Sequence, residues 1–303
     1  MDNPIFISKL CPPTTQADVV LDTDAYNEID DQFAIAYLLR SAEKLRTVAI
    51  YAAPFFNRRS EGPADGMWKS YDEIFKILTL CDKEQLKEHV FPGSEGYLTG
   101  EDIPIISPAA KDLANRAMSY TSEHPLYVVA IGAITNVASA LLLNPEIKNR
   151  IVVIWLGGHA HHWCDTKEFN MRQDYAAARV VMGSGVPFVQ LPCAGVVSEF
   201  RFSAPELNYW LTGKNPLADY LAKNTIQAAE SYAAGKPWTR VIWDVTAVAW
   251  LLNDGEKLLR NRITNTRLPD YTGQYESPIP LPMCYVYGIN RDALMEDLIR
   301  KLL

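Results

Sequence analysis

Four aspartates crowd into ten residues near the start of the chain, at Asp22, Asp24, Asp30 and Asp31. Residues 19–21 are apolar and include two valines, as in a buried strand, and the residues after Asp31 carry apolar side chains at helical spacing. Like charges at such a strand–loop–helix corner repel one another unless a cation lies among them, and Ca²⁺ prefers several flexible oxygen ligands. Alternatively, Asp30 caps the helix, Asp31 interacts with its dipole and Asp22 is an exposed strand end.

Two further segments follow strands that are predicted later in the chain. Residues 128–138 predict a strand, a turn at Gly132 and a helix, so that the Ile131 carbonyl could face a cation; a plain capped turn is the alternative. Residues 157–165 place three histidines in four positions, but neither their spacing nor an HExxH pattern fits a zinc site. We therefore expect a polar loop over a pocket, with His161 or His162 available for proton transfer.

Polar side chains also stand out at 167–174 and 240–250. Glu168 and Asn170 are two residues apart, and in an extended segment they would point the same way and could bind vicinal hydroxyls. The alternative is a loop whose polar groups are satisfied internally. Asp244 follows Val-Ile-Trp and precedes an apolar helix, so its carboxylate is expected to be enclosed. A buried carboxylate is costly unless it is paired or binds a metal, although a helix N-cap is a strong alternative.

The elements that position these residues alternate along the first two-thirds of the chain. Predicted strands at 19–22, 46–52, 126–131, 151–156 and 187–191 are separated by predicted helices at 31–40, 68–80, 107–120, 136–143 and 176–182. This order predicts an α/β fold with a mostly parallel, Rossmann-like sheet and helices on both faces. We expect one domain over 1–303, with an irregular lead-in at 1–17 and a more helical C-terminal part at 193–303.

Composition excludes several classes of protein. A net charge of −7 over 303 residues argues against nucleic-acid binding and suits an acidic pocket that a cation fills. The five cysteines are scattered without zinc spacing, which favours a reducing compartment. No signal peptide and no run long enough to span a membrane are recognised. We therefore expect a cytoplasmic protein that contacts neither nucleic acid nor a membrane.

Taken in order, the segments resemble the inosine–uridine-type nucleoside hydrolases over about residues 18–252. That family has an N-terminal strand ending in Asp-x-Asp with an Asp-Asp pair after it, a Gly-x-x-Thr-Asn turn, a Gly-Gly strand end, a Glu-Phe-Asn segment with an Asp four residues on, and a late Asp opening an apolar helix. No single motif is decisive, but their order and spacing together are specific. The matching positions are Asp22, Asp24, Asp30 and Asp31, Gly132–Asn136, Gly157 and Gly158, Glu168–Asn170, Asp174 and Asp244.

The resemblance implies Ca²⁺-dependent hydrolysis of the N-glycosidic bond of a ribonucleoside or related N-riboside. It also implies a homodimer or homotetramer. Asp24 would be the general base that activates water. The predicted calcium ligands are Asp24, Asp31, Asp244 and the Ile131 carbonyl, and the predicted ribose ligands are Asp30, Glu168 and Asn170.

The chain departs from the family pattern at two places. Five residues instead of three separate Asp24 from Asp30, so the loop must bulge and could bring Asn27 or Glu28 into the site. The family's asparagine after the second strand has its nearest match in Asn57.

The second departure is Trp243, which stands where many members carry a histidine that protonates the leaving base. An indole cannot act as that acid, but it can stack on a heterocycle. The sequence therefore predicts either activation by stacking or an acid from elsewhere, the candidates being His161, His162, Tyr232 and Arg240.

Two other functions remain open at this stage. Asp22-Thr23-Asp24 after a strand also fits the nucleophile and acid of a haloacid-dehalogenase-type phosphatase. That fold needs a later Lys and an acidic Mg²⁺ pair, whereas Gly157-Gly158-His159 lies at the relevant strand end. Loss of the acid at Trp243 would instead suit a calcium-dependent nucleoside or sugar binder without turnover.

Overall fold

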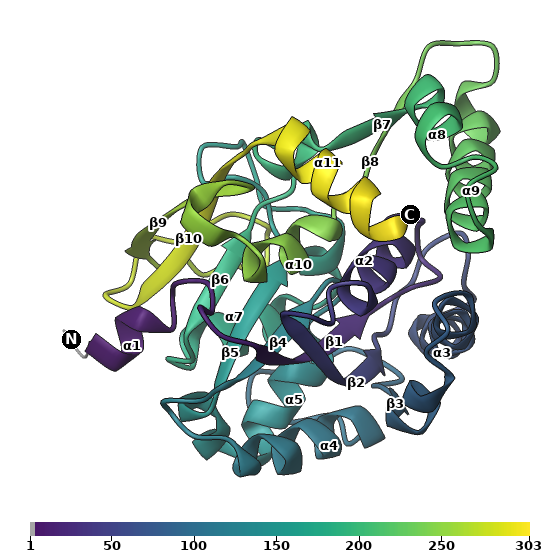
Figure 1. Ribbon diagram of the computed structural model, residues 1–303. Coiled ribbons are helices and arrows are strands. Elements are labelled where there is room, and N and C mark those ends of the chain that lie inside the picture. Colours follow the sequence, from purple (N-terminus) through teal and green to yellow (C-terminus); the bar gives the residue numbers. More distant parts are fainter. Residues whose placement is uncertain (1–3) are drawn as a thin grey trace.

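A twisted sheet of eight strands runs through the computed structural model, which describes residues 4–303 (Figure 1). All neighbouring strands are parallel except the last pair, in which β9 runs antiparallel to β10. The predicted mostly parallel sheet is therefore confirmed. In spatial order the strands are β3 (Val90–Pro92), β2 (Leu45–Ala52), β1 (Ala17–Thr23), β4 (Leu126–Ala130), β5 (Ile151–Leu156), β6 (Phe188–Leu191), β10 (Pro282–Ile289) and β9 (Leu259–Asn265).

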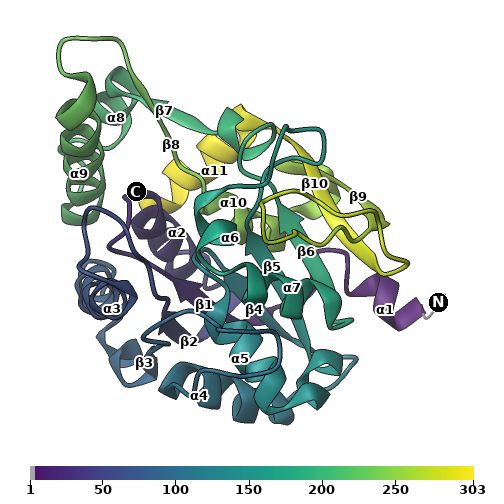
Figure 2. The same cartoon turned by 180° about the vertical axis from the view of Figure 1, so that it is seen from behind.

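Helices cover both faces of this sheet, as predicted (Figures 1 and 2). One face packs against α4 (Pro108–Arg116), α5 (Thr135–Leu143) and α7 (Tyr175–Gly183). The other packs against α2 (Asp30–Leu39), α3 (Pro63–Leu80), α10 (Val245–Leu251) and α11 (Arg291–Leu302). Strand alternation divides β1 between the two cores, because Val19 and Leu21 face α2 while Val20 faces α5.

A smaller group of elements stands beside the main layers (Figure 1). The strands β7 (Arg201–Ser203) and β8 (Thr239–Val241) pair antiparallel, and α8 (Ala204–Trp210) and α9 (Pro216–Ala233) lie between them in the chain. α9 packs against α3. Short 3₁₀ turns occur at Glu84–His89, Ala117–Ser119, Pro145–Asn149, Val197–Glu199 and Asp254–Glu256. Among residues 4–303, no helix combines the length and apolarity that crossing a membrane requires.

Two predictions about the ends of the chain need correction. The lead-in at 1–17 is not wholly irregular, because Pro4–Ser8 form helix α1, whose Phe6 and Ile7 pack on the core; residues 1–3 lie outside the described part. The C-terminal part at 193–303 contains four helices but also β7, β8, β9 and β10. Two of these strands extend the central sheet, so this part is less helical than predicted.

Asn136, at the start of α5, fixes the strand ends that lead into the acidic loop. Its side chain is fully buried. The amide Nδ2 donates to Asp22 Oδ1 at 2.8 Å and to the Ala52 carbonyl at 3.2 Å, and Oδ1 accepts from the backbone and hydroxyl of Ser94 at 2.8 and 2.9 Å. One amide thus joins β1, β2 and the loop after β3. Buried polar groups that lose such partners are costly.

We expect Asn136→Ala to lower the free energy of unfolding by about 3 kcal/mol, because it leaves Asp22 and Ser94 without their partners. Urea denaturation followed by circular dichroism measures this. Asn144→Ala is the matched control, since Asn144 is half-buried, caps a 3₁₀ turn and donates one hydrogen bond to the Ala114 carbonyl, but has no hydrogen bond to a strand end among residues 4–303. If both variants lose the same free energy of unfolding, Asn136 does not have the role of joining the strand ends that we assign to it.

Candidate active site

A cavity of about 300 Å³ opens beyond the carboxyl ends of β1, β4 and β5, the edge at which α/β sheets bind ligands. Every predicted metal ligand and ribose ligand lines it, as does Trp243, whereas the candidate acids His161, His162, Tyr232 and Arg240 do not. The lining residues that the sequence did not assign to the site are Leu156, His159, Lys167, Phe169, Arg172 and Cys193. The full lining is Asp24, Asn27, Glu28, Asp30, Asp31, Asn57, Ile131, Leu156, His159, Lys167, Glu168, Phe169, Asn170, Arg172, Cys193, Trp243 and Asp244.

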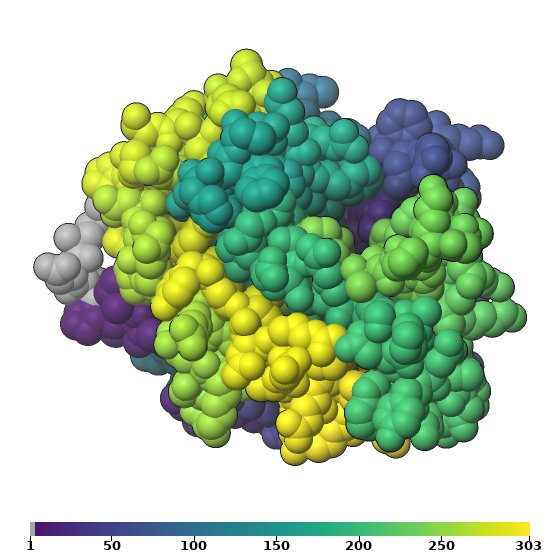
Figure 3. All heavy atoms as spheres, turned by 90° about the horizontal axis from the view of Figure 1, so that it is seen from above, coloured from purple at the N-terminus to yellow at the C-terminus, as the bar shows by residue number. Residues whose placement is uncertain are grey.

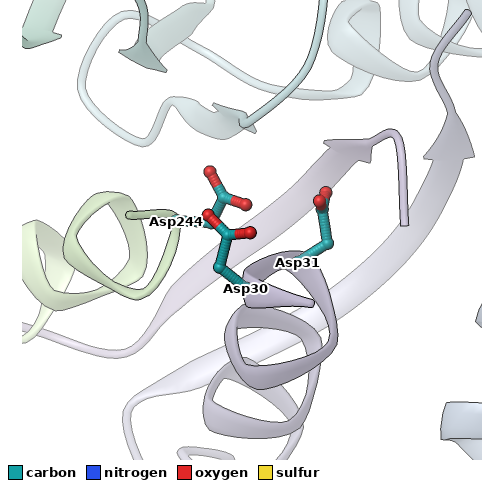
Figure 4. Close-up of side chains that lie close together, drawn as sticks. All are labelled: Asp30, Asp31 and Asp244. Carbon is teal, nitrogen blue, oxygen red and sulfur yellow. The ribbon is translucent and has the colours of Figure 1, made fainter. Parts of the chain in front are cut away.

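Three carboxylates from two helix starts converge on the floor of the cavity (Figure 4). Asp30 and Asp31 begin α2, Asp244 precedes α10, and one oxygen of each lies within 4.8 Å of the others. All three side chains are buried. Neither helix start carries a side-chain capping bond, so the simple N-cap alternative does not describe Asp30 or Asp244.

Burial and mutual repulsion make these carboxyl groups hard to ionise. Burial, followed by the charge of Asp30, raises the pKa of Asp31 to about 8. Burial, followed by Glu28, raises the pKa of Asp30 to about 7. The pKa of Asp244 is raised well above its ordinary value by burial and by the two other acids. Such a cluster is stable in its charged form only when a positive charge joins it.

Asp24 lies at the end of β1 beside this cluster. It is buried, and neither carboxylate oxygen has a hydrogen-bond partner among residues 4–303. Burial, then Asp31 and Asp30, raises its pKa well above the ordinary value. Gly132 makes room for it, because a Cβ there would lie 3.1 Å from the Asp24 Cγ. Asp24 therefore offers two unused oxygen atoms to the cavity.

The donor set fits a hard divalent cation. It consists of carboxylates and the Ile131 carbonyl, and oxygen atoms are the ligands that Ca²⁺ prefers. Such an ion would be a partner for both oxygens of Asp24 and for Oδ1 of Asp30, which have no hydrogen-bond partner among residues 4–303. The Ile131 oxygen accepts a bond from Asn170 Nδ2 at 3.1 Å, and a carbonyl has a second lone pair.

The segment with Glu168 and Asn170 was predicted to be extended, but this prediction is wrong. Glu168 caps helix α6 (Phe169–Gln173; Figure 2), and Asn170 lies within that helix. The cause is local, because the Glu168 carboxylate accepts bonds from the backbone N–H groups of Asn170 and Met171 at 2.8 and 3.0 Å. It also accepts from Gly158 N at 3.0 Å. Asn170 Nδ2 donates to two carbonyls, which leaves its Oδ1 as the amide atom open to a ligand.

The longer loop after Asp24 enters the cavity, as its length suggested. Asn27 and Glu28 both line the wall. Asn57 Nδ2 donates to Asn27 Oδ1 at 2.6 Å, so the two loops brace each other. Glu28 forms an ion pair with Arg240, which comes from β8. This ion pair links the rim of the cavity to β8 and the elements next to it.

The histidines are arranged differently from the prediction. His162 is exposed and does not line the cavity, whereas His159, directly after Gly157-Gly158, does. His161 packs against Tyr275 and Tyr285 with ring centroids 5.0 and 4.3 Å away. Burial, followed by Arg267, lowers the pKa of His161 to about 4, so it stays neutral. His162 and His161 are therefore poorly placed to protonate a leaving base.

His159 is the residue that the sequence analysis missed, and its place after a glycine pair at a strand end was the available signal. Its Nδ1 accepts the Ala194 backbone N–H at 3.2 Å. In a neutral imidazole with Nδ1 accepting, Nε2 carries the hydrogen. Burial lowers the pKa of His159. At neutral pH the ring is therefore a hydrogen-bond donor through Nε2. Trp243, half-buried, lines the same cavity.

Comparison with known proteins identifies the family. The model of the inosine-uridine preferring nucleoside hydrolases matches residues 19–275. The chain belongs to this family. It is accordingly an N-ribohydrolase, and the family match argues against the phosphatase alternative.

Individual relatives agree in sequence and in structure. The non-specific ribonucleoside hydrolase RihC of Salmonella paratyphi B is 26% identical over 253 residues, which cover 79% of each chain. The structure of a purine-preferring ribonucleoside hydrolase from Gardnerella vaginalis matches with a TM-score of 0.75 at 22% identity, over 94% of this chain and 98% of that one. A plant nucleoside hydrolase, PpNRh1, matches with a TM-score of 0.74 at 16% identity, over 95% and 99%. These two structures share the fold.

We expect Ca²⁺ to raise the melting temperature of EDTA-treated protein by about 5 °C at a hundredfold excess over its Kd. The rise should be larger at pH 8.5 than at pH 6. Because the pKa values of Asp30 and Asp31 are raised to about 7 and 8, the stability of the cation-free protein falls as pH rises through that range. Differential scanning calorimetry measures both effects.

Asp244→Asn provides the control for this experiment, since it removes one predicted ligand and one of the repelling charges. In that variant the calcium-dependent rise should shrink. If Ca²⁺ does not change the melting temperature of the unmodified chain at pH 8.5, the cation site is ruled out.

Proposed function

We propose that the chain hydrolyses the N-glycosidic bond of a ribonucleoside or related N-riboside, with Ca²⁺ and with a water that Asp24 deprotonates. The observation that carries the proposal is Asp24 itself, whose two buried oxygens have no partner and which lies among three further buried carboxylates. Asp24, Asp31, Asp244 and the Ile131 carbonyl would hold the cation. A bound Ca²⁺ orients hydroxyls and water and lowers the pKa of that water.

The sugar would occupy the wall of the cavity that carries the remaining acceptors. Asp30, Glu168 and Asn170 are buried and line this wall, and Glu28 and Asn57 lie at its rim. Their oxygens accept bonds from ribose hydroxyls. Rupture of the N-glycosidic bond builds oxocarbenium character on ribose, and nearby carboxylates stabilise that positive charge because they are already oriented.

The leaving base would lie against Trp243 and His159. As the C1′–N bond breaks, its electron pair moves to the base nitrogen, the water oxygen bonds to C1′ and the water proton passes to Asp24. An indole face stacks on a heterocycle, and the Nε2–H of neutral His159 donates a hydrogen bond to it. We therefore propose that His159, and not His162, contacts the leaving base, and that it acts as a hydrogen-bond donor.

We further propose a cytoplasmic location and a homodimer or homotetramer. The location is supported by cysteines that are all unpaired, two of them exposed. The oligomeric state rests on the family alone.

The central test is release of reducing sugar from a panel of purine and pyrimidine ribonucleosides, with and without EDTA. We expect release that EDTA abolishes and Ca²⁺ restores. If neither this panel nor related N-ribosides release sugar, while calorimetry detects calcium-dependent ribose binding, the protein is a binder and the hydrolase is refuted.

Asp24→Asn should lower kcat about a thousandfold, because the general base is lost. Asp22→Asn is the matched control, since Asp22 lies two residues earlier, is equally buried and bonds to Asn136 rather than facing the cavity. It should keep most of its activity if it remains folded, which circular dichroism checks. Near-normal turnover in Asp24→Asn would disprove the role of Asp24.

Trp243→Ala should lower kcat/KM tenfold or more, since base–aromatic stacking is worth about 1–3 kcal/mol. Trp243→Phe keeps a stacking face and should retain most of the rate. Trp210→Ala, on the outlying α8, controls for the loss of a large aromatic side chain. If Trp243→Ala matched that control, Trp243 would belong to the core packing and not to the site.

A further inference from the structure

A second hollow adjoins the cavity and differs from it in charge. This outer groove measures about 980 Å³ and shares Asn27, Glu28, Asn57, Phe169 and Arg172 with the inner cavity of about 300 Å³. Figure 3 shows the hollow between the blue atoms of the early loops and the green atoms of α9, with purple N-terminal atoms at its floor. The groove and the cavity therefore form one continuous recess.

The acids of the outer groove already have partners. Only two carboxylates line it, Glu28 and Glu73, against five cationic side chains. Glu28 pairs with Arg240. Glu73 lies 3.8 Å from Lys76 and accepts a hydrogen bond from Tyr220. These contacts leave the groove with an excess of positive charge.

Three arginines of the groove carry that excess. Arg58, Arg59 and Arg172 form no ion pair with any carboxylate of the described chain. The Arg59 guanidinium lies 4.6 Å from the centre of the Tyr26 ring, and that of Arg172 lies 5.3 Å from the Phe169 ring. Arg59 also donates one hydrogen bond, from Nη1 to the Asn27 carbonyl at 3.3 Å. Stacking on a ring holds a guanidinium in place while its remaining N–H groups can bind an anion.

The positive charge of the groove is opposite in sign to the net charge of the molecule. The whole chain has a net charge of −7, and the inner cavity is lined mainly by acids. An anionic group would be repelled from the cavity floor and attracted to the groove beside it. Arginine forks match phosphate oxygens in geometry and charge.

We propose that the outer groove binds a phosphate group of the substrate, so that the preferred substrate is a phosphorylated N-riboside. The ribose lies in the acidic cavity, and the phosphate is bound by Arg58, Arg59 and Arg172. This inference rests on the proposed function and narrows its substrate class. The phosphate belongs either to a nucleoside 5′-monophosphate or to a diphosphate that joins two ribosides.

The activity test compares kcat/KM for inosine, inosine 5′-monophosphate and NAD with the calcium-loaded enzyme. We expect a phosphorylated substrate to exceed inosine at least tenfold at low salt, and the ratio to fall as salt screens the arginines. Preference for the monophosphate or for NAD distinguishes the two phosphate sources. If kcat/KM for inosine equals that for both phosphorylated substrates, the inference is overturned and the proposed function still holds.

Variants separate the groove from general charge effects. Arg58→Gln and Arg172→Gln should each lower the ratio of phosphorylated to unphosphorylated kcat/KM about tenfold, and Arg58→Lys should restore part of it. Arg260→Gln is the matched control, because Arg260 is an exposed arginine on β9 at the far edge of the sheet. If the ratio of phosphorylated to unphosphorylated kcat/KM is the same in all these variants, Arg58 and Arg172 do not bind the phosphate.

Binding provides a readout that does not need turnover. Calorimetry with ribose and with ribose 5-phosphate, in the presence of Ca²⁺, measures the contribution of the phosphate directly. We expect ribose 5-phosphate to bind at least tenfold more tightly, or NAD to do so if the phosphate is a diphosphate. If neither binds more tightly than ribose, the inference fails even when the enzyme is inactive.

Discussion

The structure depends on one electrostatic constraint: several carboxylates are buried together, and none of them forms an ion pair with a cationic side chain of residues 4–303. Asp24, Asp30, Asp31 and Asp244 meet where the end of β1 faces the starts of α2 and α10. Arg240, whose charge partly offsets the rise that burial causes in the pKa of Asp30, is paired to Glu28 at the rim. Packing of α2 and α10 forces the acids together, and the free energy of their repulsion must be offset by protons or by a divalent ion.

The rest of the site follows from how this cluster is enclosed. Thr23 donates to Asp31 Oδ1 at 2.5 Å, so strand β1 supports the cluster from one side with Thr23 and supports α5 from the other through Asp22. The two residues are neighbours with opposite orientations, as a strand requires. Replacing Gly132 by a larger residue would press on Asp24. The same backbone therefore sets both the core and the chemistry.

The sheet and most of the candidate site could be predicted from the sequence because their signals are local. The strand Ile151–Leu156 is a continuous apolar run, and the aspartates follow such runs at fixed spacing. Strand β9 was missed because it is a polar edge strand, rich in Arg and Asn, without an apolar pattern. Strand β10 was missed although its Cys-Tyr-Val-Tyr core is typical of a strand. His159 follows a glycine pair at a strand end, but the spacing of the three histidines does not show that the loop turns His162 away from the cavity.

The acid cluster also has a consequence for how the chain is made. Asp31 and Asp244 are separated by about 200 residues of sequence, yet their oxygens lie within 4.8 Å. During synthesis the N-terminal acids emerge long before α10, and a nascent chain holds only part of the ion site. Contacts of such long range form late in folding. The proposed cation site, and with it the proposed reaction, is therefore complete only when nearly the whole chain has been assembled.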